Sequence, residues 1–311
     1  MAVPTEYRST DASAPVLTGE SGKLHLLLKA ILVDGYGAKA AAGWTMPYNS
    51  GTDYAMFRPG AGLQHYLWVH DIPAQMSRCA GYVTASSFAA GTFQFPTEAQ
   101  FSAGLYIRKS IVASATARPW ICWATGKAVL LFILGGSTVL TTVTGGENTL
   151  YFGDIQNALA GDAYHTLLIA STDTSTSSTS FTATRTSIVA YGTAPGGHYS
   201  PASYTQIAGS VAIGKRSTAI YQQASSGIAP AAPYPDPCSA GLHLSNILVF
   251  ESNLATRGKL PGVLNIGHTS SSFTHLDTFS GSGDLAGRNF TIVGGGGSGY
   301  AIAVETNGGW V

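Results

Sequence analysis

Two aspartates in the middle of the chain, Asp154 in YFGDI and Asp162 in AGDAYH, have the residue type needed for acid–base catalysis. Glycoside hydrolases use a pair of carboxyl groups about 5 to 9.5 Å apart, so one hypothesis is a glycan hydrolase that uses these two residues. A Gly-Asp pair at a strand end is more often part of a turn, and the chain has only 16 acidic residues. The sequence contains no G-x-S-x-G nucleophile motif. We therefore predict structural roles for both aspartates and no catalytic residue.

The stretch VDGYGAKAAAGW (33–44) contains glycines and a lysine of the kind that hold phosphate. A dinucleotide site needs its glycines after a strand and at the N-terminus of a helix. Here they follow an expected helix and precede an expected strand. We therefore predict a joint in which Gly35 ends the helix, Gly37 lets the chain reverse and Lys39 is solvated.

A second stretch, GSVAIGKRS (209–217), has the G-x-x-x-x-G-K spacing of a phosphate-binding loop. The residue after the lysine should be Ser or Thr, which holds the magnesium ion, but it is Arg216. We predict no nucleotide and no other cofactor.

The histidines give no helical metal motif, because no pair has the H-x-x-x-H spacing. His65, His70 and Asp71 fall on one strand candidate, where a period of two puts His65 and Asp71 on one face and His70 on the other. His268, His275 and Asp277 form a second group, which we interpret as exposed polar loop residues. We predict no metal, although ligands from distant segments remain an alternative. The histidines are His25, His65, His70, His165, His198, His243, His268 and His275.

The three cysteines, Cys79, Cys122 and Cys238, are an odd number without Cys-X-X-Cys spacing. This pattern indicates neither a disulfide framework nor a zinc site. We interpret all three as buried small hydrophobic residues in a reducing compartment.

Charge is scarce in this 311-residue chain: 10% of residues are charged, the 16 basic and 16 acidic side chains balance, and 45% are hydrophobic. An average soluble domain has about 25% charged residues. A neutral surface without a basic face does not favour nucleic-acid binding. The N-terminus lacks the apolar core of a signal peptide, and the longest apolar run, AVLLFIL (128–134), is too short for membrane insertion. These features are typical of a soluble subunit whose surface is covered by neighbours.

One helix is expected, with Ser21 as its cap and Leu24, Leu27, Leu28 and Ile31 forming an apolar stripe. A second short helix is expected in FPTEAQFSAG, with Pro96 at its first position.

The remaining pattern predicts strands. RPWICWA and AVLLFIL, joined by Thr125-Gly126-Lys127, are the clearest hairpin, and GWTMPYN and DYAMFR form another with its turn at Asn49 to Gly51. HYLWVHDI, AGYVTA, TLYFGDI, YHTLLIAS and the final FTIV and YAIAVET are further candidates. In GLHLSNILVFE, we expect Leu242, Leu244, Leu248 and Phe250 to share one face.

These elements predict a mainly β fold, a β-sandwich or a barrel-like sheet, with one N-terminal helix and long Gly/Ser/Pro-rich loops. The expected parts are an N-terminal arm (1–20), a helix with the first β-rich region (21–190), a Pro/Gly/Ala-rich excursion outside the core (191–240) and a C-terminal β region (241–311). The Ser/Thr tract Ser171 to Ser187 is expected to be an exposed loop that passes into a polar strand.

Five further stretches are distinctive: YRSTDASAPVLTGESGKL, ILVDGYGAKAAAGWT, YFGDI with GDAYHTLLIAS, RGKLPGVLNIGH and DTFSGSGDLAGRNFTIV. In their order and spacing, from about Tyr7 to Trp310, they resemble a family of tailed-bacteriophage virion structural proteins. The resemblance implies a tail, baseplate or unspecified virion component, and it brings no catalytic residues with it.

We therefore expect a non-enzymatic structural subunit of a phage particle, located in the virion, whose partners are copies of itself and other virion proteins. The alternatives are a tail protein that binds a host-surface glycan or protein, and a capsid decoration protein. We favour core packing for the early aromatic residues, and interface anchoring is the alternative. These residues are Trp44, Tyr48, Tyr54, Phe57, Tyr66 and Trp68.

Overall fold

A computed structural model describes residues 1–51, 53–88, 90–100, 102–143, 147–171, 196–202, 216–219, 234–250, 256–295 and 301–311. The fold is mainly β, as the sequence predicts, and every strand pair is antiparallel.

The first sheet has eleven strands, in the order β1-β9-β10-β11-β13-β8-β5-β4-β3-β2 with β14 also paired to β13. Its strands are β1 (Thr5–Arg8), β2 (Thr45–Asn49), β3 (Tyr54–Arg58), β4 (Tyr66–His70), β5 (Met76–Tyr82), β8 (Leu105–Arg108), β9 (Trp120–Ala124), β10 (Ala128–Leu134), β11 (Glu147–Asp154), β13 (Thr166–Ser171) and β14 (Gly196–Tyr199).

The second sheet has seven strands, in the order β15-β16-β17-β20-β19-β18 with β12 also paired to β17. They are β12 (Gln156–Asn157), β15 (Arg216–Ala219), β16 (Leu244–Phe250), β17 (Thr256–Ile266), β18 (Thr278–Ser280), β19 (Asn289–Gly294) and β20 (Ala301–Glu305). Outside the two sheets, β6 (Thr84–Ser87) pairs with β7 (Ala90–Thr92) as a two-stranded ribbon. The described residues also form two single 3-10 turns, Ser270–Ser272 and Gly283–Leu285.

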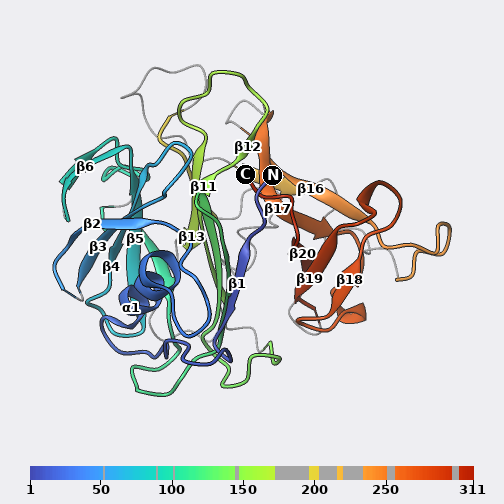
Figure 1. The fold of residues 1–311 in the computed structure, drawn as a ribbon, viewed down its shortest axis with the longest axis horizontal. Coiled ribbons are helices and arrows are strands. Elements are labelled where there is room, and N and C mark those ends of the chain that lie inside the picture. The colour runs from blue at the N-terminus through green and yellow to red at the C-terminus, as the bar shows by residue number, and fades with distance from the viewer. Residues whose placement is uncertain are drawn as a thin grey trace.

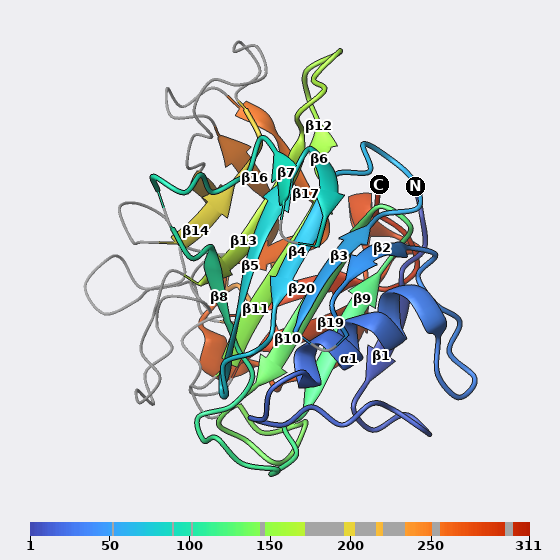
Figure 2. The same cartoon turned by 90° about the vertical axis from the view of Figure 1, so that its left-hand side faces the viewer.

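The first sheet curls around one hydrophobic core, which the helix closes, and the second sheet packs on the opposite side of β9, β10, β11 and β13 (Figures 1 and 2). These central strands are therefore covered on both faces. All seven residues of β10 are buried, with Leu131 in the first core and Leu130 in the second. Burial on both faces explains why AVLLFIL is a continuous apolar run rather than an alternating one.

The helix forms where the apolar stripe predicts it, as α1 (Lys23–Lys29) followed by a π-helical turn, Ala30–Asp34. The stripe is buried, and Gly35 ends the turn with a φ of 78° and an N–H donated to the Ala30 carbonyl at 2.8 Å. The expected cap is wrong: Gly22 occupies that position, and the Ser21 hydroxyl donates to the carbonyl of Asp71 instead. No helix of the described residues is long and apolar enough to cross a membrane.

Both predicted hairpins are present. β9 pairs with β10, beginning with Ala124 opposite Val129 next to the turn. β2 pairs with β3 across the turn at Asn49 to Gly51. The Thr125 hydroxyl accepts the N–H groups of Lys127 and Ala128, which fixes the first turn. Most other strand candidates also form strands, since they supply β4, β11, β13, β19 and β20, whereas AGYVTA is divided between the end of β5 and the start of β6.

The expected helix at Pro96 is wrong. Phe95 is fully buried and exchanges two backbone hydrogen bonds with Gly81, at 2.7 and 2.8 Å. This pairing keeps the chain extended up to Pro96, and the residues after it form only a turn, in which Gln100 N–H donates to Thr97.

The predicted face of GLHLSNILVFE is also wrong in its second half. Pairing with β17 shifts between Asn246 and Leu248, and such an irregularity changes which side chains point inward. Ile247 and Val249 are therefore the buried residues, while Leu248 is only half-buried.

Part of the expected 191–240 excursion belongs to the core, because β14 extends the first sheet and Tyr199 and Ala202 are buried. Most of the Ser/Thr tract and residues 203–215, including most of the loop-like stretch GSVAIGKRS, lie outside the described residues.

Candidate functional site

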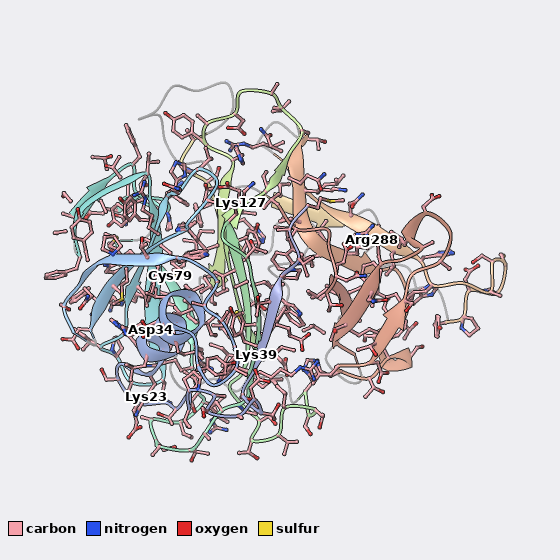
Figure 3. The ribbon with its side chains drawn as sticks, viewed as in Figure 1. Lys23, Asp34, Lys39, Cys79, Lys127 and Arg288 are labelled. Carbon is pink, nitrogen blue, oxygen red and sulfur yellow. The ribbon has the colours of Figure 1, made fainter. Side chains whose placement is uncertain are left out.

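The stretch 33–44 is a joint between helix and sheet. Tyr36 and Lys39 exchange backbone hydrogen bonds at 3.0 and 2.8 Å, and Trp44 N–H donates to Leu32 in the helical turn. Lys39 is not simply solvated as expected: its Nζ donates to the carbonyl of Glu6 in β1 at 2.7 Å, so it ties the joint to the sheet edge (Figure 3).

Asp154 lies at the buried end of β11. Its carboxylate accepts the Leu63 N–H and the Thr166 hydroxyl, both at 3.0 Å, and the His165 Nε2 is 3.8 Å away. Burial raises the pKa of this carboxyl, and the hydrogen bond from Leu63 opposes that shift. Asp154 therefore holds the loop 59–65 against the end of the first sheet.

Asp162 forms a buried pair with Arg257. The two carboxylate oxygens accept from Nε at 2.5 Å and Nη2 at 2.7 Å, so the contact is bidentate. Arg257 Nη1 also donates to the Ser200 hydroxyl and the Ala202 carbonyl, at 2.9 and 2.6 Å. Both carboxylate oxygens of Asp162 thus pair with Arg257, which links the loop before β13 to β17 of the second sheet. Both aspartates are therefore hydrogen-bonded within the protein, Asp154 to Leu63 and Thr166 and Asp162 to Arg257.

The histidine groups do not converge on a metal site within the described part of the chain. His268 and His275, expected in exposed loops, are buried. His268 Nε2 accepts the His243 N–H at 2.7 Å, and His275 Nδ1 accepts the Gly294 N–H at 3.2 Å. The segment that carries His275 runs beside β19, where the Leu276 N–H donates to the Ile292 carbonyl at 2.8 Å.

The cysteine prediction holds for two residues and fails for one. Cys79, labelled in Figure 3, and Cys122 are buried in the first core as free thiols, whereas Cys238 is exposed. Cys238 lies in a tight turn in which its N–H donates to the Asp236 carboxylate at 3.0 Å, so its side chain is left outside the core.

Because two histidines are buried, we expect the free energy of unfolding to fall in acid. Burial lowers the pKa of His65 and of His275 to about 4. An unfolded histidine titrates near 6.5, so between about pH 6.5 and 4 the unfolded chain binds protons that the folded chain does not. Above pH 6.5 the contribution is complete and constant. The free energy of unfolding is expected to fall on acidification by up to about 1.4 kcal/mol per pH unit for each histidine.

Urea unfolding at pH 7 and at pH 5 measures how far the free energy of unfolding falls on acidification. In His65→Gln, whose side chain cannot titrate, this fall should be smaller than in the unmodified protein. An equal fall in both proteins would contradict the lowered pKa of His65.

The described surface carries apolar side chains at one end of the first sheet, which we name the aliphatic end. Val16, Ile72, Val112 and Val139 lie in four loops at this end and are 41% to 62% exposed, and Leu26 is exposed on the nearby α1. The loops lie at the lower edge of Figure 1, away from the two chain termini. Isolated exposed apolar residues are ordinary, and these are distinguished by lying in loops at the same end of the sheet.

Backbone hydrogen bonds join these loops to one another. Gln75 N–H donates to Gly19, Gly19 N–H to Ser114 and Ile111 N–H to Gly135, at 2.7 to 3.1 Å. The Arg118 guanidinium adds a bond to the Ser137 carbonyl at 3.0 Å. These hydrogen bonds fix the conformation of the loops at the aliphatic end within the single chain. A surface with a fixed conformation loses less entropy on association.

A buried ion pair lies beneath this surface. Lys109 Nζ donates to Asp71 Oδ1 and to the Glu20 carbonyl, both at 2.6 Å, and to the Pro73 carbonyl at 3.2 Å. The other Asp71 oxygen accepts the His25 N–H of α1 at 2.9 Å. Burial lowers the pKa of Lys109, and the charge of Asp71 opposes that shift. The pair anchors the loops and the helix together.

The sequence did not single out the aliphatic end, because its members lie in four loops far apart along the chain. No family model matches the chain, and no curated protein matches it.

Proposed function

We propose that this protein is a non-enzymatic structural subunit of a tailed-bacteriophage particle, in the tail or baseplate, and that it assembles through the aliphatic end. The observation that carries the proposal is the set of exposed aliphatic side chains on four hydrogen-bonded loops. The resemblance of the sequence to virion structural proteins supplies the setting.

The chemistry of the described residues supports assembly rather than catalysis. The two aspartates that suggested a hydrolase are used to hold loops and sheets together. The scarcity of charge also suits a surface that neighbours cover, since a freely soluble monomer usually carries more.

The double variant Val112→Glu/Val139→Glu tests the assembly surface. Both side chains are exposed in the single chain, so the variant should fold with an unchanged melting temperature. A carboxylate buried without a partner at an interface is strongly unfavourable. Incorporation into particles should therefore fall by about tenfold or more, measured by quantitative mass spectrometry of purified virions.

Val3→Glu is the matched control, because Val3 is 65% exposed but lies next to the chain terminus. It should incorporate normally, at a copy number that is a multiple of three or six. Normal incorporation of the double variant would refute the proposed surface, and absence of the chain from virions would refute the function. If the isolated protein blocks adsorption to cells, the receptor-binding alternative gains support.

A further inference from the structure

The outer side of the first sheet carries a second group of partly exposed side chains, which are aromatic where those of the aliphatic end are aliphatic. Alternation along β3, β4 and β5 sends one set of side chains into the core and the other set outward. Leu67 and Val69 are fully buried, whereas Trp68 between them is half-buried on the outer side. We name this surface the aromatic face, and its rings are Tyr54, Tyr66, Trp68, His70, Tyr106 and, from the β6–β7 ribbon, Phe88.

The rings of the aromatic face hold one another in place. Tyr54 stacks on His70 with centroids 4.3 Å apart and planes within 6°. It also lies 6.1 Å from Trp68 and 5.6 Å from Phe88. The indole N–H of Trp68 donates to the Phe88 carbonyl at 3.0 Å, which fixes the ribbon against the sheet. Rings held this way lose little further freedom when a ligand binds.

Planar polar groups surround these rings. The Arg58 guanidinium lies 5.5 Å from the Tyr66 centroid and donates to the Gln64 side chain at 2.7 Å. Arg78 lies 6.0 Å from the Tyr106 centroid. Two buried nitrogens, Nε2 of His70 and Nε of Arg78, have no hydrogen-bond partner among the described residues. The face therefore sets two guanidinium groups, which carry only N–H donors, beside its tyrosine rings.

We propose that the aromatic face binds a neutral oligosaccharide. A pyranose ring has an apolar underside of C–H groups, which packs on an aromatic face, and a rim of hydroxyls, which pair with guanidinium, imidazole and amide groups. Burial lowers the pKa of His70, so near pH 7 its imidazole is neutral and adds no charge to the face.

The neighbouring side chains favour a sugar over a protein partner. The outward aliphatic residues of these strands, Met56 and Ala80, are fully buried and offer no contact area. The ribbon beside the rings exposes small hydroxyls, such as Thr84 and Thr92, which pair with each other. Both guanidinium groups lie over tyrosine rings, where their N–H groups stand beside the surface on which a sugar would pack.

Tryptophan fluorescence can report on this face specifically. Of the five tryptophans, Trp44, Trp120, Trp123 and Trp310 are at most 3% exposed, and Trp68 is the half-buried one. The experiment is an array of neutral oligosaccharides from bacterial surface polysaccharides, followed by titration of the strongest ligand against tryptophan emission. We expect saturable binding with a change in emission that disappears in Trp68→Phe.

Three variants locate the site. Tyr54→Ala should weaken binding by about tenfold or more, whereas Tyr54→Phe, which keeps the ring, should bind within about threefold of the unmodified protein. Tyr234→Ala removes a ring that is 46% exposed in the segment before β16, beside Phe273, and should leave binding unchanged.

The proposal fails if no neutral oligosaccharide on the array binds at about 1 mM, or if Tyr54→Ala binds as tightly as the unmodified protein. It also fails if Tyr54→Ala changes the oligomeric mass of the protein, because the face would then contact a second copy. The test is independent of the assembly proposal, since Val112→Glu/Val139→Glu should keep its sugar affinity.

Discussion

Replacing Lys109 by methionine is expected to destabilise the protein by about 3 to 5 kcal/mol. The ammonium group is fully buried and makes three hydrogen bonds, one of them to Asp71. Methionine fills similar volume but leaves the buried Asp71 carboxylate without its counter-charge, and an uncompensated buried charge accounts for most of this penalty. Equilibrium urea unfolding measures the change in the free energy of unfolding.

Two further variants test this explanation. Adding Asp71→Asn to Lys109→Met removes the unpaired charge but keeps an oxygen for the His25 N–H, so it should recover part of the lost stability. Lys23→Met is the surface control, because Lys23 lies 3.7 Å from Glu20 in an exposed pair. It should change stability by less than about 1 kcal/mol. If Lys109→Met is no more damaging than Lys23→Met, the pair does not anchor the helix.

The sequence predicts the helix and the hairpins because their signals are local. The helix requires only a stripe of leucines followed by Gly35, and the β9–β10 hairpin requires two apolar runs joined by three turn residues. Gly153 is a local sequence signal for the close approach of β11 to β10. A Cβ at this position would collide with the backbone of Ala128.

The failures arise where a distant contact outweighs the local pattern. Phe95 pairs with Gly81 and prevents the expected helix, and the irregular pairing of β16 with β17 turns Ile247 inward. Asp71 and Lys109 are 38 residues apart, and their pairing follows only from the order of strands in the folded sheet. Which of the alternating side chains in YLWVH face the core likewise depends on the curl of the sheet.

Replacing Arg257 by methionine is the second change expected to have a large effect, again about 3 to 5 kcal/mol. Arg257 connects β17 of the second sheet to the loop that carries Asp162 and to the segment after β14, 95 and 55 residues away in sequence. Its loss leaves the Asp162 carboxylate buried with only the Tyr164 N–H as a described donor at 2.9 Å. Urea unfolding and hydrogen exchange at β12 and β14 measure the effect.

Hydrogen exchange distinguishes a local from a global role for Arg257. Because its bonds join the two sheets, we expect Arg257→Met to raise exchange in β12, β14 and β17 while β3 and β4, on the far side of the first core, stay protected. The double variant Arg257→Met/Asp162→Asn should restore part of the stability, since it removes the buried charge. Arg8→Met, which breaks a partly exposed pair with Glu6, should cost no more than about 1 kcal/mol. Equal losses in Arg257→Met and Arg8→Met would show that the second sheet is held by its apolar contacts with β9, β10 and β11 alone.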